Sequence, residues 1–264
     1  MKSLLQRIAK KHYDKELAKT YGSVNTLKKD SERKYVSDFP SLNQGANIAG
    51  PNDLHTILMK LKPKGKYFDI GCGRGKDIIR YEKKGYDSKG IDISELQVIE
   101  ARKNLVKVGI KVEKVQWLDA LEEVSSLKNF FDLITSLHIY QHFTSEEALI
   151  ATKNALSMLK DDGVFLLVVK IDVDDWDEYF RKGVKVEVED EKNYVFRMWD
   201  DDLGCWRPGY HLFFPGEIEK IIKEAGGNII DVPTYKGLMK GVVRHDSGRN
   251  FPCVAYYIKK VVRK

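Results

Sequence analysis

A glycine-rich turn at residues 69–75, with the sequence DIGCGRG, is the first place in the chain where residue types and spacing predict chemistry. It follows a short apolar run and precedes an amphipathic segment, so it connects a strand to a helix. Because glycine has no Cβ, a backbone with Gly71, Gly73 and Gly75 can come close to a nucleotide-like ligand. Turns of this kind also simply close strand-to-helix connections, so the turn alone does not establish a ligand site.

Two carboxylates add to the turn. Asp92 ends the next apolar run, where its side chain can accept hydrogen bonds from both hydroxyls of a ribose; the alternative is a helix-capping aspartate. Asp119 follows the third run, where it can accept a hydrogen bond from an adenine amino group. A dinucleotide-binding dehydrogenase would need a third glycine at position 76, and the residue there is Lys76. The spacing therefore disfavours a dehydrogenase.

Apolar and amphipathic segments alternate from about residue 66, which predicts βαβ units around a parallel sheet. The predicted strands are 67–70, 89–92, 111–116, 131–136 and 164–170. The predicted helices are 76–84, 94–108, 145–159 and 215–225. Ser94 and Thr144 precede acidic first turns and are predicted amino-terminal caps. Glycine, or the sequence Asp-Asp-Gly after the third helix, is the predicted stop of each helix.

The pattern changes after the fifth predicted strand. Residues 184–189 and 194–199 alternate apolar with polar side chains across the polar turn 190–193. This alternation predicts an antiparallel hairpin within an insertion at 171–209, rather than another βαβ unit.

The carboxyl-terminal part of the chain predicts the end of the main sheet. Residues 228–232 and 254–258 form the expected hairpin pair, and no helix of useful length separates them, so the last strand is expected to be antiparallel. We therefore expect one α/β domain at 51–264. Residues 1–50 are amphipathic and then polar, and are expected to form a helical cap or lid.

The turn and the acids together resemble the class I S-adenosylmethionine-dependent methyltransferases over about residues 66–170. That family shares the pattern Asp-x-Gly-x-Gly-x-Gly, an acid ending the second strand, an acid after the third, and an aspartate opening the fourth, here Asp132. The resemblance implies a doubly wound, seven-stranded, mostly parallel sheet whose last strand is antiparallel. It also implies S-adenosyl-L-methionine as the cofactor and S-adenosyl-L-homocysteine as the product.

The same resemblance implies which residues hold each part of the cofactor. The methionine portion is assigned to Asp69, Gly71, Cys72, Gly73 and Gly75. The adenosine portion is assigned to Asp92, Ile93, Asp119 and Ala120, and the wall of the sulfonium pocket to Leu137.

Methyl transfer from a sulfonium needs no nucleophilic residue, because the protein only orients the acceptor and sometimes removes a proton. His138 and His142 follow the fourth strand and are candidate general bases, although packing or a backbone hydrogen bond is an alternative role for each. Tyr140 lies between them as a candidate catalytic residue and substrate contact, or as a pocket wall. Residues 135–140 lack the Asn/Asp-Pro-Pro-Tyr/Phe motif of exocyclic-base methyltransferases, and no cysteine matches the nucleophile of pyrimidine C5 methyltransferases.

An aromatic-rich stretch precedes the last predicted helix. Trp206, Tyr210 and His211 in this stretch are the predicted substrate contacts, since aromatic side chains can clamp a substrate. The alternative is that they cover a small core of the insertion itself.

The charge pattern bears on the acceptor. Residues 1–30 carry eight Lys/Arg against three acids, and residues 236–264 carry eight against one. Residues 172–202 carry twelve acids against five Lys/Arg, and this segment would repel a polyanion near the expected substrate mouth. We therefore expect a nitrogen or oxygen atom of a small molecule as the acceptor.

RNA remains the alternative acceptor. Residues 209–213 with 216–218 look like the tRNA wobble-uridine carboxymethyl-esterifying methyltransferases, and residues 42–47 with 73–77 are faintly similar to mRNA cap guanine-N7 methyltransferases. A more remote alternative is a cofactor-binding module without catalysis.

Composition indicates the compartment. The sequence has 42% hydrophobic residues, no apolar run of about eighteen residues, and too short an apolar start for a signal peptide. Its three cysteines lack CxxC spacing, which argues against disulfides or a structural zinc site. We expect a cytoplasmic protein that does not bind membranes, with no metal, whose oligomeric state the sequence does not indicate.

Overall fold

The computed structural model describes only part of the chain, and the predicted cap at residues 1–50 lies outside the described residues. The described residues are 51–170, 186–190, 195–200, 205–206, 210–211, 213, 216–231, 242–244 and 252–262. Among them, no helix combines the length and apolar character needed to cross a membrane.

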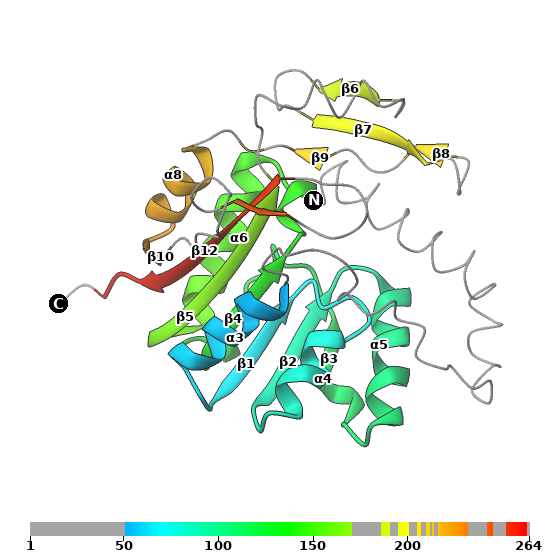
Figure 1. The fold of residues 1–264 in the computed structure, drawn as a ribbon, viewed down its shortest axis with the longest axis vertical. Helices are drawn as coiled ribbons and strands as arrows, with labels where there is room; N and C mark the ends of the chain where they lie inside the picture. Colours follow the sequence, from blue (N-terminus) through cyan, green and yellow to red (C-terminus); the bar gives the residue numbers. More distant parts are fainter. Residues whose placement is uncertain are drawn as a thin grey trace.

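A single large sheet forms the centre of the domain, with the strand order β10-β12-β5-β4-β1-β2-β3 and β11 added beside β12 (Figure 1). Its strands are β1 (Lys66–Ile70), β2 (Asp87–Asp92), β3 (Val115–Trp117), β4 (Phe131–Leu137), β5 (Leu159–Lys170), β10 (Gly227–Asp231), β11 (Val242–Arg244) and β12 (Pro252–Lys260). The pairs among β1 to β5 are parallel, whereas β12 runs antiparallel to both β5 and β10. The predicted seven-stranded fold is therefore confirmed, with β11 as a short additional strand.

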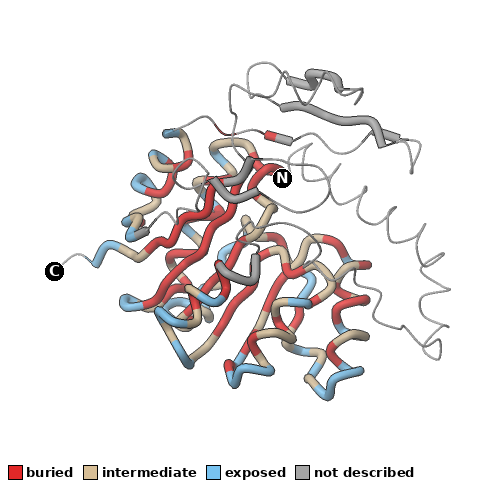
Figure 2. Tube along the Cα trace, viewed as in Figure 1, coloured by how far each residue is buried: buried red, intermediate tan, exposed pale blue. Residues whose placement is uncertain are grey.

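Helices cover both faces of this sheet (Figure 1). One face packs against α3 (Pro51–Leu61), α4 (Lys76–Glu82) and α5 (Glu95–Lys107), and the other against α6 (Ser145–Met158) and α8 (Glu217–Glu224). Three short 3-10 turns, η1 (Val112–Lys114), η2 (Ser125–Leu127) and η3 (Tyr140–His142), complete the connections. Figure 2 shows that the buried residues follow the central strands and the inward sides of the helices. Because helices bury both faces of the sheet, the parallel strands are nearly continuously apolar.

The two predicted helix caps are confirmed. The Ser94 side chain accepts a hydrogen bond from the backbone N–H of Gln97, which starts α5. Thr144 and Glu147 form a reciprocal capping box at the start of α6. These caps fix where each helix begins, and hence which residues of its first turn face the carboxyl edge of the sheet.

Two predicted boundaries were wrong. Residues 111–116 are not one strand, because residues 112–114 form η1, where the Lys114 ammonium group pairs with Glu82 and Asp87. The sequence Asp-Asp-Gly at 161–163 does not separate a helix from a strand. Instead β5 begins at Leu159 directly after α6, and its register against β4 shifts across 160–163, where Lys160 pairs with Asp132.

A second sheet follows β5 in the chain. The predicted hairpin is confirmed as β6 (Val186–Asp190) and β7 (Val195–Asp200), which pair antiparallel. The sequence did not predict that β8 (Cys205–Trp206) and β9 (Tyr210–His211) also pair with β7. β9 contacts η3, so the inserted sheet meets the main domain beside the loop after β4.

Candidate active site

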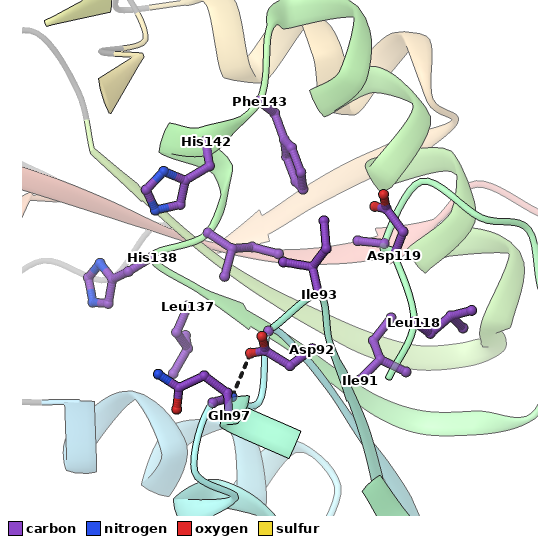
Figure 3. A pocket seen from close by; sticks show the side chains of 14 residues that line it. Ile91, Asp92, Ile93, Gln97, Leu118, Asp119, Leu137, His138, His142 and Phe143 are labelled. Atoms are coloured by element: carbon purple, nitrogen blue, oxygen red, sulfur yellow. Dashed lines mark hydrogen bonds between the residues drawn. The ribbon is translucent and has the colours of Figure 1, made fainter. Parts of the chain in front are cut away.

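A cavity of about 260 Å³ lies at the carboxyl ends of β1, β2, β3 and β4. Its walls come from the turns after these strands, from the first turn of α5 and from η3. The lining residues are Gly71, Gly73, Ile91, Asp92, Ile93, Gln97, Leu118, Asp119, Ala120, Leu137, His138, Ile139, His142 and Phe143. Figure 3 shows His138 and His142 on one side of this cavity and Asp119 on the opposite side. Most of the predicted cofactor residues and both predicted histidines therefore meet at one place.

The three glycines of the turn have different roles. A Cβ on Gly73 would have only the Gln97 Oε1 atom within 4 Å, at 3.9 Å, so the space in front of Gly73 belongs to the cavity. A Cβ on Gly71 would lie 2.3 Å from the Ile139 side chain, and one on Gly75 2.9 Å from Leu105. Gly71 thus lets the loop after β4 approach the turn. Gly75 does not line the cavity and instead lets the start of α4 pack against α5.

Asp92 connects the turn to the end of β2. Its Oδ2 atom accepts a hydrogen bond from the Gly73 N–H at 2.8 Å, the dashed line in Figure 3. Its Oδ1 atom accepts one from the Ser94 N–H at 2.9 Å. The residue that caps α5 is Ser94, so the capping role considered for Asp92 belongs to its neighbour. A carboxylate offers about four acceptor positions, so hydroxyl groups of a ligand can join these two backbone donors.

Asp69 and Cys72 do not line the cavity. The Asp69 carboxyl group is 4% exposed and accepts a hydrogen bond from Thr135 Oγ1 at 2.7 Å. Burial, followed by the nearby Asp77 carboxylate, raises the pKa of Asp69 to about 8. The Cys72 side chain is buried, and burial raises the pKa of its thiol well above the usual range. Cys72 contributes to the turn through its backbone, since its N–H donates to the Ile91 carbonyl at 2.9 Å.

The opposite end of the cavity is built around Asp119 and Ile93. Asp119 is buried, and its Oδ1 atom accepts a hydrogen bond from the Leu121 N–H at 3.0 Å, which holds the carboxylate at the cavity wall. The Trp117 indole N–H donates to the Ile93 carbonyl at 2.9 Å, so the edge strand β3 fixes the position of Ile93. Ala120, also predicted, lies beside them in the lining.

The loop after β4 places His138 and His142 at the cavity, whereas Tyr140 between them lies outside the lining. His138 has φ +60°, a left-handed conformation that is uncommon for residues other than glycine and is often found at functional sites. His142 is buried and lines the same wall. Tyr140, predicted as a catalytic residue and substrate contact, is instead fully buried away from the lining. Its hydroxyl lies 3.0 Å from Thr152 Oγ1, so it attaches η3 to α6.

None of the three predicted substrate contacts, Trp206, Tyr210 and His211, is among the described lining residues. His211 is 2% exposed, its Nδ1 atom lies 2.8 Å from the Phe143 carbonyl oxygen, and its Nε2 atom lies 3.5 Å from Glu217 Oε1. These contacts make His211 a link between β9, η3 and α8 rather than a lining residue. The side chains of Trp206 and Tyr210 lie outside the described residues.

Gln97 is the main polar cavity residue that sequence reasoning missed. Its Oε1 atom is buried and has no hydrogen-bond partner among the described residues. An unsatisfied buried acceptor is unfavourable unless a ligand supplies a donor. The predicted Ser94 cap could have revealed this residue, because it makes Gln97 the third residue of α5. A side chain at that position points back toward the start of the helix, which here lies beside Gly73.

Comparisons with known proteins identify the family of this chain. The family model described as a methyltransferase domain matches residues 49–238, which is more than half of the chain. The chain belongs to this methyltransferase family, as the resemblance implied. A curated relative from Geobacillus sp. (strain WCH70), named only as a candidate methyltransferase, is 27% identical over 152 residues, or 54% of this chain. The match spans only 59% of that relative's length.

Solved structures share the fold. A protein from Pyrococcus horikoshii OT3 aligns with a TM-score of 0.61 and 18% identity over 78% of this chain and 87% of its own. The 1,6-didemethyltoxoflavin-N1-methyltransferase of Burkholderia thailandensis, solved with S-adenosylhomocysteine bound, aligns with a TM-score of 0.55 and 15% identity over 78% of this chain and 76% of its own. At these identities the similarity shows the common fold.

Proposed function

We propose that this protein is an enzyme that transfers a methyl group from S-adenosyl-L-methionine to a nitrogen or oxygen atom of a small-molecule acceptor. The observation that carries the proposal is the pair of acids at one cavity. Asp92 lies beside Gly73 at one end, where it can accept from ribose hydroxyls, and Asp119 lies at the other, where it can accept from an adenine amino group. The open space at Gly73 and the Gln97 Oε1 atom, which no described residue pairs with, also fit a bound nucleoside.

The chain's own residues then perform orientation and proton removal. The bound cofactor supplies a methyl group that is already activated on a sulfonium, so the acceptor must be held in line with it. Leu137 and Phe143 provide apolar walls that exclude water. His138 and His142 lie on the side away from Asp119, where either imidazole can accept the proton that the acceptor loses.

The lining supports a small acceptor over RNA. The described lining residues include two aspartates and two histidines but no lysine or arginine. A site that holds RNA phosphates would carry basic side chains, because phosphate contacts dominate nucleic-acid affinity. The Burkholderia thailandensis protein of the same fold is named for a small-molecule acceptor, 1,6-didemethyltoxoflavin.

Transfer of labelled methyl groups tests the acceptor class. The protein is incubated with methyl-labelled S-adenosylmethionine and a lysate that has been separated into small molecules, RNA and protein. We expect label in the small-molecule fraction, unchanged by ribonuclease and absent with heat-inactivated protein. Label that stays in the large fraction and is released by ribonuclease would replace the small-molecule acceptor with RNA.

A further inference from the structure

A buried histidine ties the inserted sheet to the wall of the cavity. His211 lies in β9, where it pairs with Val195 of β7, and β9 contacts η3 of the main domain. Figure 1 shows β9 on the side of the inserted sheet that faces the main domain. The His211 Nδ1 atom lies 2.8 Å from the carbonyl oxygen of Phe143, which lines the cavity. Because a carbonyl group only accepts hydrogen bonds, Nδ1 carries the proton and donates it.

The Phe143 carbonyl group depends on this donor. Thr144 is the amino-terminal cap of α6, and the cap residue is the first whose carbonyl group accepts a hydrogen bond within the helix. The Phe143 carbonyl group lies one residue earlier, so α6 supplies no donor for it. Phe143 is also buried, and a buried carbonyl group is unfavourable without a partner. The His211 imidazole satisfies this group.

Packing fixes the direction in which the imidazole donates. His211 is buried, and its ring lies against Phe213 with ring centroids 4.0 Å apart. Its Nε2 atom lies 3.5 Å from Glu217 Oε1 of α8, and that oxygen also accepts a hydrogen bond from Ser145 Oγ of α6 at 2.6 Å. These contacts restrict rotation of the ring. The donor at Nδ1 is therefore held by the packed core and not by β9 alone.

The same bond is one of two ties that hold His142 at the cavity. On one side of His142, the Tyr140 hydroxyl lies 3.0 Å from Thr152 Oγ1 of α6. On the other side, Phe143 accepts the bond from His211. His142 itself is buried and lines the cavity. Because η3 has only three residues, a shift of the Phe143 carbonyl group would also move the adjacent imidazole of His142.

We propose that His211 is a positioning residue of the methyl-transfer site, which holds the Phe143 carbonyl group so that His142 faces the methyl acceptor. The proposal rests on the proposed function, in which His142 is one of two imidazoles that can accept the proton of the acceptor. His211 does not line the cavity and acts only through η3. The inserted sheet is then part of the site, because β9 supplies the donor that fixes this wall.

Two amide variants separate the hydrogen bond from packing. The amide nitrogen of asparagine branches from Cγ, as Nδ1 of histidine does, so His211→Asn can still donate to the Phe143 carbonyl group. In His211→Gln the amide lies one bond farther out, close to the place of Nε2, and the bond to Phe143 is lost. Both variants remove the ring and its packing against Phe213. They therefore differ chiefly in the bond to the cavity wall.

Methyl transfer from labelled cofactor measures the effect, in the lysate fraction that the wild-type protein labels. At saturating cofactor, His211→Gln should lower the rate about 10- to 100-fold, the expected result of displacing a catalytic group by up to about 1 Å. His211→Asn should keep most of the wild-type rate. Both variants should keep the wild-type affinity for S-adenosylhomocysteine, because Asp92 and Asp119 belong to other loops.

Tyr256→Phe is the matched control for these variants. It removes one hydrogen bond to α8, in which the Tyr256 hydroxyl donates to Glu219 Oε1 at 2.8 Å, and leaves η3 in place. It should not change the rate. Circular dichroism and assays well below each melting temperature ensure that every variant is compared in its folded form.

Histidine NMR tests the same inference without an acceptor. The chain has six histidines, so the ring signal that disappears in His142→Gln identifies His142. This signal should move further from its wild-type position in His211→Gln than in His211→Asn, because only the first variant releases the Phe143 carbonyl group.

Equal rates in the asparagine and glutamine variants, or equal displacement of the His142 signal, would overturn the proposal and make His211 a structural contact only. Those results would leave the proposed function intact. A wild-type protein that neither binds S-adenosylhomocysteine nor transfers label would remove the proposed function and, with it, the positioning role of His211.

Discussion

Replacing Asp92 with alanine should weaken S-adenosylhomocysteine binding by roughly 30- to 1,000-fold, equivalent to about 2–4 kcal/mol for two charge-assisted hydrogen bonds. The carboxylate would contact both ribose hydroxyls, and it also accepts from the Gly73 and Ser94 N–H groups. Its removal therefore loosens the turn and deletes the ribose contacts together. Isothermal titration calorimetry measures the change directly.

A variant of the same strand provides the control for Asp92→Ala. Asp87 begins β2 at the opposite edge of the sheet, is exposed, and pairs with Lys114. Asp87→Ala removes an equal charge and should leave the dissociation constant unchanged. Unaltered affinity in Asp92→Ala, with the fold intact by circular dichroism, would refute the ribose role.

Replacing Gly73 with valine should abolish cofactor binding while lowering the melting temperature only slightly. A Cβ at this position meets nothing closer than 3.9 Å, so the new side chain starts in open space and extends into the space of the ligand. Gly73 has φ +49°, so some backbone strain is expected, on the order of 1–2 kcal/mol. Thermal unfolding and calorimetry on the same sample separate the two effects.

Gly85→Val is the control for this backbone strain. Gly85 has φ +85° and nothing within 4 Å of an added Cβ, and it follows α4 away from the cavity. Gly85→Val should lower stability by a similar amount and leave binding unchanged. If Gly73→Val lowered the melting temperature far more than Gly85→Val and lost binding with it, the turn would be explained by folding alone.

The sequence predicted the main sheet well because its signals are local. Continuous apolar runs, the Ser94 and Thr144 caps and the glycine turn each depend on neighbouring residues, and the corresponding elements formed within a few residues of their predicted bounds. Boundaries failed where a distant partner decides the conformation. η1 ends at Lys114, whose ammonium group pairs with Glu82 and Asp87 about 30 residues earlier, and β5 starts where its register against β4 shifts.

The candidate site was predicted in part for the same reason. Asp92, Asp119 and His138 follow strands directly, so their places at the carboxyl edge follow from topology. Tyr140 adjoins the cavity residue Ile139 in sequence, but its partner Thr152 turns it inward. His211 bonds to the Phe143 backbone and does not line the cavity. Local sequence does not reveal such partners.

Glycine positions show the same limit. The alternating pattern of the turn makes its glycines look equivalent. The structure shows that an added side chain would enter open space only at Gly73 of these three, because Ile139 and Leu105 fill the space in front of Gly71 and Gly75. Those two contacts come from elements 30 or more residues away in the chain. Distant contacts, and not the local sequence, therefore decide which glycine faces the ligand.

Binding of S-adenosylhomocysteine to the wild-type protein tests the central claim most directly, because it depends on no assumption about the acceptor. Calorimetry should show one saturable site, and the melting temperature should rise with ligand concentration. At a hundred times the dissociation constant, the ligand should add about 2.7 kcal/mol to the free energy of unfolding. Absence of both binding heat and a thermal shift at millimolar ligand would contradict the assignment of this cavity to the cofactor.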